Sequence, residues 1–316
     1  MWQASDSKIW QGRDDSRESP TAKRVFQTIH SLQTWQPEQT AQHVALLGFA
    51  SDVGVARNLG RVGAAKAPPV LRQALANMAS QTSAYPLLDA GDIHYPDGDL
   101  DAAQNEFAQA VQAIHAHQGK TLVLGGGHET AFAHGSGLYA AYPDQRIAII
   151  NFDPHLDLRR HHQATSGTPF AQLAQLAHTQ NRPFDYTCIG ASGAANTAAL
   201  LQDAEHLGVN IVWDTDIHWG NVNAVLSHIE QVLSRADIVY LTIDLDVLPS
   251  YQMPAVSAPA ALGIALDLLI HLITPILQSG RLVGADVAEF NPDFDIDKQG
   301  ARVAARLLWH IWQTWR

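Results

Sequence analysis

Acidic and histidine residues directly follow several apolar runs of this chain. The run "IAIINF" leads into "DPHLDLRRHH", which places Asp153, His155 and Asp157 at alternate positions. Alternate positions of an extended chain point to the same side, so these three side chains can face one site. Like charges gathered on one face are costly unless water or a counter-charge offsets them. The spacing therefore predicts a partner of positive charge.

The same arrangement follows three other apolar runs. These residues are His128 and Glu129 after "TLVLGGG", Asp244 and Asp246 in "LTIDLD", and Glu289 after "RLVGADVA". Any one of them alone would more commonly be a helix cap or an ordinary polar contact. Taken together they indicate one site, because the carboxyl ends of parallel strands meet at the same edge of a sheet.

Divalent cations are the partners that this set of side chains favours. Four aspartates carry four negative charges, which two divalent cations would neutralise: Asp153, Asp157, Asp244 and Asp246. The candidate ligands offer only oxygen and nitrogen, which disfavours a structural zinc site and suits manganese or a similar metal. Two such ions about 3.5–4 Å apart can share one water and lower its pKa, which supplies a nucleophile near neutral pH.

Strands and helices alternate along the sequence. Eight apolar runs rich in Val, Ile and Leu are typical of strands buried on both faces, and they span residues 43–49, 84–91, 121–127, 146–152, 186–191, 209–214, 237–244 and 281–288. Segments with helical spacing of apolar residues lie between them, at 103–118, 193–206, 221–235 and 262–278. This succession predicts a parallel sheet covered by helices.

Composition narrows the function classes. The chain has 316 residues, 46% of them hydrophobic, and a formal net charge of −11. An acidic protein is a poor match for nucleic acid or an anionic membrane as its main partner. With neither an apolar stretch of about 18 residues nor a signal peptide, the expected location is cytoplasmic. Cys188 is the single cysteine, and its apolar surroundings favour a buried structural thiol.

The two ends of the chain are rich in tryptophan. Residues 1–42 form a polar segment with Trp2, Trp10 and Trp35, which predicts an irregular arm that docks through its aromatic rings. Residues 299–316 read as a helix with tryptophans three residues apart. The favoured interpretation of this helix is packing against the body of the protein or against a neighbouring subunit, so a homo-oligomer is possible.

Four motifs give the chain a resemblance to a known family. They are "GGGHE" at 125–129, "DPHLD" at 153–157, "DLD" at 244–246 and "DVAEFNP" at 286–292. In this order they resemble the arginase/ureohydrolase family of binuclear manganese hydrolases, although Pro154 replaces the alanine usual in the second motif. The resemblance implies one domain over residues 1–316, with a three-layer α/β/α fold around an eight-stranded parallel sheet.

The resemblance also implies a ligand set for two manganese ions. One ion would be held by His128, Asp153, Asp157 and Asp244. The other would be held by Asp153, His155, Asp244 and Asp246, so that Asp153 and Asp244 bridge the pair.

Three further stretches, at 51–75, 165–170 and 256–263, most resemble the family members that hydrolyse N-formimidoyl-L-glutamate to L-glutamate and formamide in histidine degradation. In those members a glutamate matching Glu289 contacts the cationic nitrogen group of the substrate. Phe170 stands where arginases carry a histidine, which leaves the proton shuttle open. Asp246 is a candidate for this transfer, and His161 and His162 are either a proton relay or plain loop residues.

A substrate with two carboxylates requires cationic side chains. Arg159 lies two positions after Asp157 and is expected to face the same site, where arginases carry an asparagine. The competing interpretation is that the arginines pair with surface carboxylates. The other candidates for substrate contact are Arg57, Asn58, Arg61, Ser166, Thr168 and Asn196.

Three alternatives compete with the hydrolysis of a formimidoyl amidine. Another ureohydrolase, of the agmatinase or guanidinobutyrase type, would release urea from a guanidine substrate that needs fewer arginines. A two-metal phosphoesterase is disfavoured because Glu289 would repel a phosphate. A binding protein without catalysis is disfavoured because all six ligand positions are present.

Overall fold

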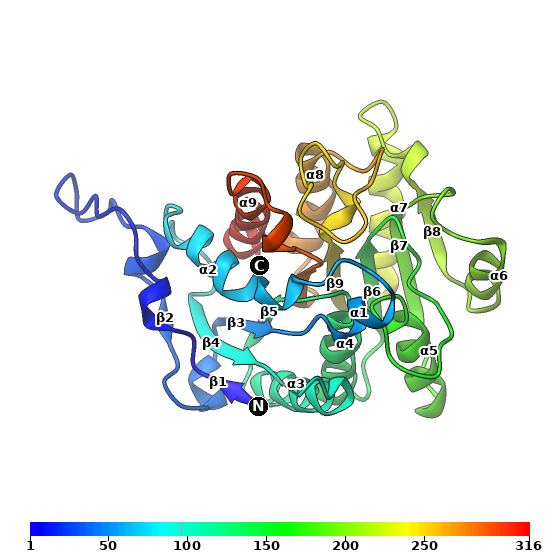
Figure 1. Cartoon of the computed structure of the whole chain (residues 1–316), viewed down its shortest axis with the longest axis horizontal. Coiled ribbons are helices and arrows are strands. Elements are labelled where there is room, and N and C mark those ends of the chain that lie inside the picture. The colour runs from blue at the N-terminus through cyan, green and yellow to red at the C-terminus, as the bar shows by residue number, and fades with distance from the viewer. Residues whose placement is uncertain (96) are drawn as a thin grey trace.

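The structure is a computed structural model that describes residues 1–95 and 97–316. Its centre is a sheet whose long strands lie in the order β4-β3-β5-β10-β9-β6-β7-β8 (Figure 1). Their bounds are β3 Val44–Phe49, β4 Leu87–Ile93, β5 Lys120–Leu124, β6 Ile147–Phe152, β7 Asp185–Ala191, β8 Asn210–Trp213, β9 Ile238–Asp244 and β10 Leu282–Ala288. All neighbours in this order pair in parallel. The predicted eight-stranded parallel sheet is confirmed.

Two short strands at the beginning of the chain extend the sheet. Strand β1 (Trp2–Gln3) pairs with β4 in the antiparallel sense, and β2 (His30–Ser31) pairs with β4 in parallel. The first 42 residues are therefore less irregular than predicted, because part of the arm adds its backbone hydrogen bonds to an edge strand.

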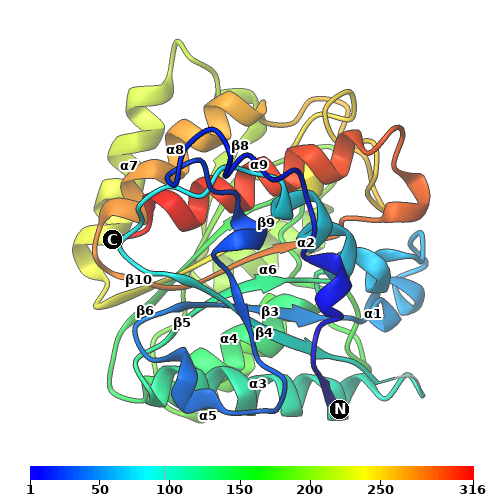
Figure 2. The ribbon, with the colours of Figure 1, turned by 90° about the vertical axis from the view of Figure 1, so that its left-hand side faces the viewer.

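Helices cover both faces of the sheet (Figures 1 and 2). Their bounds are α1 Val53–Arg57, α2 Ala67–Ala76, α3 Leu100–Ala116, α4 Thr130–Ala141, α5 Pro169–Thr179, α6 Ala198–His206, α7 Val222–Arg235, α8 Leu266–Gln278 and α9 Gln299–Thr314. One hydrophobic core contains side chains of α2, α7, α8 and α9, and the other contains side chains of α3, α4, α5 and α6. Neighbouring residues of a strand enter opposite cores, as Leu46 and Leu47 of β3 do. This is the predicted three-layer arrangement.

The tryptophans at both ends dock on the body of the protein. In the arm, the indole of Trp2 donates to the carbonyl of Ala90 at 2.7 Å, and the indole of Trp10 donates to Asp89 at 2.7 Å. The Trp35 ring packs against that of Trp2. In and directly after α9, the indoles of Trp309, Trp312 and Trp315 donate to the carbonyls of Ala79, Tyr85 and Leu282. In the structure both ends of the chain thus contact the body through tryptophan side chains.

The helices that the structure describes lack the combination of length and apolar composition needed to cross a bilayer.

The order of the strands places the candidate residues together. Strands β5, β10, β9 and β6 are consecutive neighbours in the middle of the sheet. Their carboxyl ends lead to His128, Glu289, Asp244 and Asp153, respectively. The four motifs therefore meet at one edge, because parallel strands end on the same side.

A buried ion pair ties α2 to β4, next to the arm. Arg72 and Asp89 are fully buried, and the guanidinium Nη2 of Arg72 lies 3.0 Å from an Asp89 carboxylate oxygen. Asp89 also accepts the indole hydrogen of Trp10, so the same carboxylate binds the body and the arm.

We expect Arg72→Met to lower the free energy of unfolding by about 3–5 kcal/mol, because Asp89 would remain buried without its counter-charge. Urea unfolding followed by circular dichroism measures the change. The control is Arg302→Met, which breaks the exposed pair with Asp297 and should leave the urea midpoint unchanged. Equal midpoints for the two variants would contradict this account of the ion pair.

Candidate metal centre

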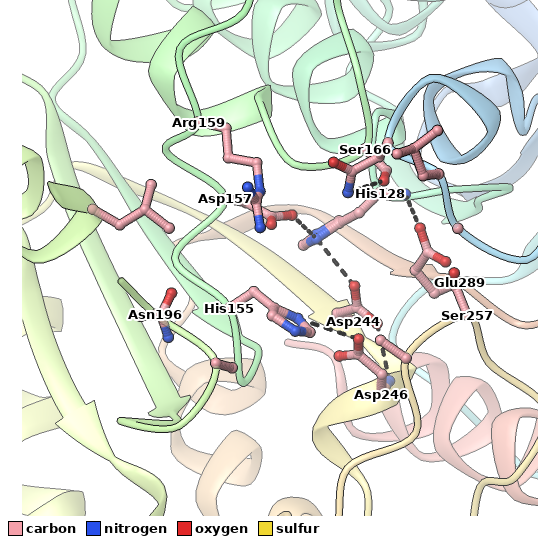
Figure 3. Close-up of a pocket in the computed structure, with 16 residues that line it drawn as sticks. His128, His155, Asp157, Arg159, Ser166, Asn196, Asp244, Asp246, Ser257 and Glu289 are labelled. Carbon is pink, nitrogen blue, oxygen red and sulfur yellow. Dashed lines mark hydrogen bonds and ion pairs between the residues drawn. The ribbon is translucent and has the colours of Figure 1, made fainter. Parts of the chain in front are cut away.

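Two groups of potential metal ligands lie side by side at the carboxyl ends of the central strands. Figure 3 shows their members His128, His155, Asp157, Asp244 and Asp246. The first contains His128, Asp153, Asp157 and Asp244, and the second contains Asp153, His155 and Asp246. Within each group the ligand atoms lie within 4.8 Å of one another. The structure thus brings together all six residues singled out from the sequence.

Asp153 belongs to both groups. Its Oδ2 lies 3.1 Å from Nδ1 of His128, and its Oδ1 lies 3.3 Å from Nδ1 of His155. The carboxylate is fully buried and is oriented by the side-chain amide of Asn151, which donates to Oδ2 at 3.1 Å. Its two oxygens therefore face two different sites, which is the geometry of a bridging ligand.

The remaining carboxylates complete the two groups. Asp157 and Asp244 place an oxygen 2.9 and 3.3 Å from Nδ1 of His128. Asp246 places an oxygen 3.3 Å from Nδ1 of His155. Asp244 is not a member of the second group, although its Oδ1 accepts the backbone N–H of Asp246 at 2.9 Å.

The backbone after β6 differs from the extended chain that the sequence predicts. The strand ends at Phe152, and the chain turns so that the amide of His155 donates to Oδ1 of Asp153 at 2.6 Å. Asp157 has a φ of 48°, in the left-handed region that a non-glycine residue enters at a cost. The predicted convergence of the three side chains is present, but a turn and one strained residue produce it. Similarly, Asp246 lies in a 3-10 turn that follows β9.

Glu289 is also held in a left-handed conformation, with a φ of 67°. Its Oε1 accepts the backbone N–H of His128 at 2.9 Å, and its own N–H donates to the carbonyl of Gly126 at 2.8 Å. The other oxygen, Oε2, is buried with no hydrogen-bond partner in the described part of the chain. These bonds join the segment after β10 to the turn after β5 and leave one carboxylate oxygen available.

The pKa shifts of the acidic and imidazole groups indicate that the centre requires positive charge. Burial raises the pKa of Asp244 well above its ordinary value, with Asp246 and Asp153 adding to the shift, and burial raises the pKa of Asp157 and of Asp246 to about 6. Burial opposes a charge on the rings, yet the carboxylates raise the pKa of His128 well above its ordinary range and that of His155 to about 12. The carboxylates therefore demand positive charge, which protons or cations can supply.

The donors present fit a pair of hard or borderline divalent cations. Both groups offer imidazole nitrogen and carboxylate oxygen, and Oδ1 of Asp246 is buried without a hydrogen-bond partner among the described residues. The thiol of Cys188 is not a ligand, because Sγ lies 3.4 Å from the carbonyls of Asp153 and His155 and burial raises its pKa well above the ordinary value. The thiol is buried, as predicted.

A cavity of about 280 Å³ opens over the two groups, a size that suits a small ligand. Of the residues predicted to contact substrate, it is lined by Asn58, Arg159, Ser166, Asn196 and Glu289. The lack of a side chain at Gly167 leaves space for Arg159, because a Cβ on residue 167 would lie 2.8 Å from Cδ of the arginine. Asn58 donates to the hydroxyl of Ser166 at 3.1 Å and joins the two sides of the cavity.

Asn196 lines the cavity, but its side-chain amide forms hydrogen bonds with backbone atoms. Its oxygen accepts the N–H of Leu156 at 2.9 Å, and its nitrogen donates to the carbonyls of Pro154 and Ser192 at 2.8 and 2.9 Å. The geometry assigns this side chain to holding the loop that carries His155 and Asp157.

Other predicted residues lie outside this cavity. Arg57, Thr168, His161 and His162 line a neighbouring cavity of about 560 Å³, which adjoins the first through Arg159. Arg57 donates to the carbonyl of Ala164 at 3.0 Å, and the Thr168 hydroxyl donates within its own turn. Arg61 packs over the ring of Phe294. The adjacent histidines therefore face the basic neighbouring cavity and do not line the cavity over the ligand groups.

Sequence reasoning did not assign roles to three residues that support the centre. Thr242 on β9 has its hydroxyl 3.1 Å from Nε2 of His128. Glu129 is buried, accepts the N–H of Gly54 at 2.8 Å, and has its pKa raised by burial to about 7. Ser257 lines the cavity and accepts the N–H of Arg61 at 2.9 Å. Two of them had a visible signal, because Glu129 stands inside the "GGGHE" motif and Ser257 inside the stretch 256–263.

Gly54 allows α1 to approach the centre closely. We expect Gly54→Ala to lower the free energy of unfolding by about 1–3 kcal/mol, because a Cβ would lie 2.5 Å from Cδ of Glu129 and 2.8 Å from the backbone nitrogen of Ser166. Thermal unfolding measures the effect. Gly193→Ala is the control, because no atom lies within 4 Å of its Cβ position. If Gly54→Ala and Gly193→Ala lower the free energy of unfolding by the same small amount, the predicted crowding at Gly54 is wrong.

Comparison with known proteins places the chain among hydrolases of this architecture. A family model described as "Arginase family" matches residues 42–313. Formimidoylglutamase of Photorhabdus laumondii is 52% identical over 315 residues, covering 100% of this chain and 99% of the relative, and that of Salmonella heidelberg is 51% identical over 316 residues with the same coverage.

Solved structures agree with this placement. A Trypanosoma cruzi formiminoglutamase solved with Mn²⁺ is 25% identical, with a TM-score of 0.81 over 93% of this chain and 98% of that chain. Formimidoylglutamase of Bacillus subtilis is 22% identical, with a TM-score of 0.83 over 96% and 94% of the two chains, and shares the fold. The four motifs, the sheet order and these relatives agree that the chain belongs to the arginase family.

Proposed function

We propose that this protein is a binuclear manganese hydrolase that converts N-formimidoyl-L-glutamate and water to L-glutamate and formamide. The observation that carries the proposal is the pair of ligand groups joined by Asp153, with Arg159 and Glu289 lining the same cavity. Relatives that are about half identical over the full chain bear the name formimidoylglutamase, which supports this substrate.

His128, Asp153, Asp157 and Asp244 would hold one ion, and Asp153, His155, Asp244 and Asp246 the other. Asp153 would contribute to both sites, because its two oxygens face the two histidines, and Asp244, which belongs to the first group and accepts the backbone N–H of Asp246, is the proposed second shared ligand. When bound, two such ions lower the pKa of a shared water and supply a nucleophile near neutral pH.

In this proposal Glu289 binds the amidinium of the substrate, and Asp246 transfers the proton. The amidinium of the substrate is cationic, and the unpaired Oε2 of Glu289 can accept its N–H and hold its carbon over the centre. The unpaired Oδ1 of Asp246 can accept a proton from the attacking water and deliver it to the leaving nitrogen. The water oxygen adds to the amidinium carbon to give a tetrahedral carbon, and one water proton passes through Asp246 to the glutamate nitrogen. The C–N bond then breaks, and the remaining hydroxyl proton goes to the departing amine, which gives formamide and the ammonium group of L-glutamate.

Arg159 is the proposed partner of a substrate carboxylate. It lines the small cavity over the centre and also the basic neighbouring cavity, so it lies at the boundary between them. Ser166 and Asn58 offer further hydrogen-bond donors close to Arg159, because a Cβ on Gly167 would lie 2.8 Å from Cδ of Arg159 and 3.3 Å from Nδ2 of Asn58. Arg57, Thr168, His161 and His162 line the neighbouring cavity, where positive charge would favour the approach of a substrate with two carboxylates.

We place this reaction in histidine degradation in the cytoplasm, with residues 1–316 forming one domain. The net charge of −11 supports a small-molecule substrate in preference to nucleic acid or a membrane surface. Association of subunits is possible on the pattern of the family.

The decisive experiment incubates the purified protein with Mn²⁺ and, separately, N-formimidoyl-L-glutamate, guanidinobutyrate, agmatine and arginine. We expect formamide from the first substrate and no urea from the others, because the cavity combines an arginine with Glu289. Asp244→Ala is the matched negative control, which should lose bound metal and activity together. Urea from any guanidine substrate, or full metal content in Asp244→Ala, would overturn the assignment.

Arg159→Met should raise KM for N-formimidoyl-L-glutamate about 10- to 100-fold while kcat changes little, because the carboxylate contact is remote from the reacting bond. Steady-state kinetics at constant ionic strength give both constants. Arg302→Met is the control: its guanidinium is exposed and pairs with Asp297, and Arg302 lines neither cavity. If the two variants have the same KM, Arg159 does not contact the substrate.

A further inference from the structure

A row of hydrogen-bonded polar side chains crosses the core between α3, α4 and the sheet. We call it the Tyr142–Asp286 network, and it consists of Tyr142, His115, Thr121, His134 and Asp286. The Tyr142 hydroxyl lies 3.0 Å from Nδ1 of His115, whose Nε2 lies 3.0 Å from the Thr121 hydroxyl. That hydroxyl lies 2.7 Å from Nε2 of His134, whose Nδ1 lies 2.6 Å from Oδ2 of Asp286.

All members of the network except the half-buried Tyr142 are buried, so the network needs an explanation. Thr121, His134 and Asp286 have no exposed surface, and His115 is 7% exposed. Buried polar groups gain little stability over apolar side chains of similar volume, since their desolvation offsets their attraction. What such a network does provide is one defined geometry for the elements that it joins.

The network has a head-to-tail order when each imidazole carries one proton. The Asp286 carboxylate accepts from Nδ1 of His134, and in that tautomer Nε2 accepts from the Thr121 hydroxyl. Thr121 then accepts from Nε2 of His115, whose Nδ1 accepts from Tyr142. Burial lowers the pKa of His115 to about 3, so that ring is neutral, as this order requires. Every bond is then satisfied head to tail, from Tyr142 to Asp286.

The joined elements are those that flank the turn bearing His128. Thr121 lies on β5 and His134 on α4, and residues 125–129 connect these two elements. Asp286 lies on β10, which leads to Glu289, the acceptor for the backbone N–H of His128. Asp286 is also the direct partner of Thr242 across β10 and β9, and Thr242 contacts Nε2 of His128.

We propose that the Tyr142–Asp286 network is a positioning device for His128, which holds β5, α4 and β10 so that the imidazole keeps its place among Asp153, Asp157 and Asp244. Thr242 supplies the last contact, because its hydroxyl accepts from Nε2 and leaves Nδ1 free to bind a metal. This role rests on the proposed function, since it concerns the ion that His128 would hold.

The test removes the middle hydroxyl of the network. Thr121→Val keeps the shape but removes both hydrogen bonds to the histidines, whereas Thr121→Ser keeps the hydroxyl. Mn²⁺ titration followed by electron paramagnetic resonance counts bound ions and gives the two affinities. We expect Thr121→Val to lower the affinity for one of the two Mn²⁺ ions about tenfold or more and to leave the affinity for the other unchanged. Thr121→Ser should bind both ions with the affinities of the parent.

Thr187→Val is the matched control. Thr187 is fully buried on β7 of the same sheet, and its hydroxyl has no hydrogen-bond partner in the described part of the chain. This variant should bind both ions as the parent does. Parent-like binding by Thr121→Val, or equal weakening of both ions, would overturn the positioning role and leave the network with a structural role only.

Imidazole nitrogen chemical shifts test the direction of the network without any metal. The parent should show His134 protonated at Nδ1 and His115 protonated at Nε2; the opposite tautomer of either ring would overturn the proposal. A parent that binds two Mn²⁺ but does not release formamide would refute the proposed substrate alone. A parent that binds no Mn²⁺ would refute the proposed function and, with it, the role assigned to the network.

Discussion

The attraction between two imidazoles and one buried carboxylate is the interaction on which the rest of the structure depends. Asp153 meets His128 with one oxygen and His155 with the other, while three more aspartates approach from the surrounding turns. So many acidic groups can share a dry site only if positive charge lies between them. Sheet order, turn conformation and supporting hydrogen bonds all serve to bring these groups to the same few ångströms.

Bringing the acidic groups together requires unfavourable backbone conformations at two residues. Asp157 and Glu289 both adopt left-handed conformations, which are unfavourable for a residue with a Cβ, although less so for aspartate than for glutamate. Each is held by its neighbourhood: the carbonyl of Asp157 accepts the N–H of Phe170, and Glu289 is bonded to the turn at Gly126 and His128. Strain at two residues of one small site is what a preorganised site would require.

The sequence predicted the sheet and the six ligand positions because their signals are local. Runs such as 237–244 are apolar throughout, and the acidic residues follow them directly. Helix α4 carried no such signal, since it is buried on most sides and lacks an amphipathic pattern. Asn196 and Thr168 were assigned to substrate by position alone, whereas their hydrogen bonds go to neighbouring backbone and side chains. Such pairings depend on tertiary contacts that no single segment encodes.

The sheet order also decides when the centre can exist during synthesis. Strand β10 is the last to be made, yet it lies between β5 and β9. The strands β3 to β5 and β6 to β9 therefore form two half-sheets that stay unjoined until residues 282–288 enter between them. His128 belongs to the first half-sheet, and Asp153 and Asp244 belong to the second. A ribosome-bound chain cannot assemble the whole centre early, so a folding intermediate without β10 lacks a complete place for the ion that His128 would hold.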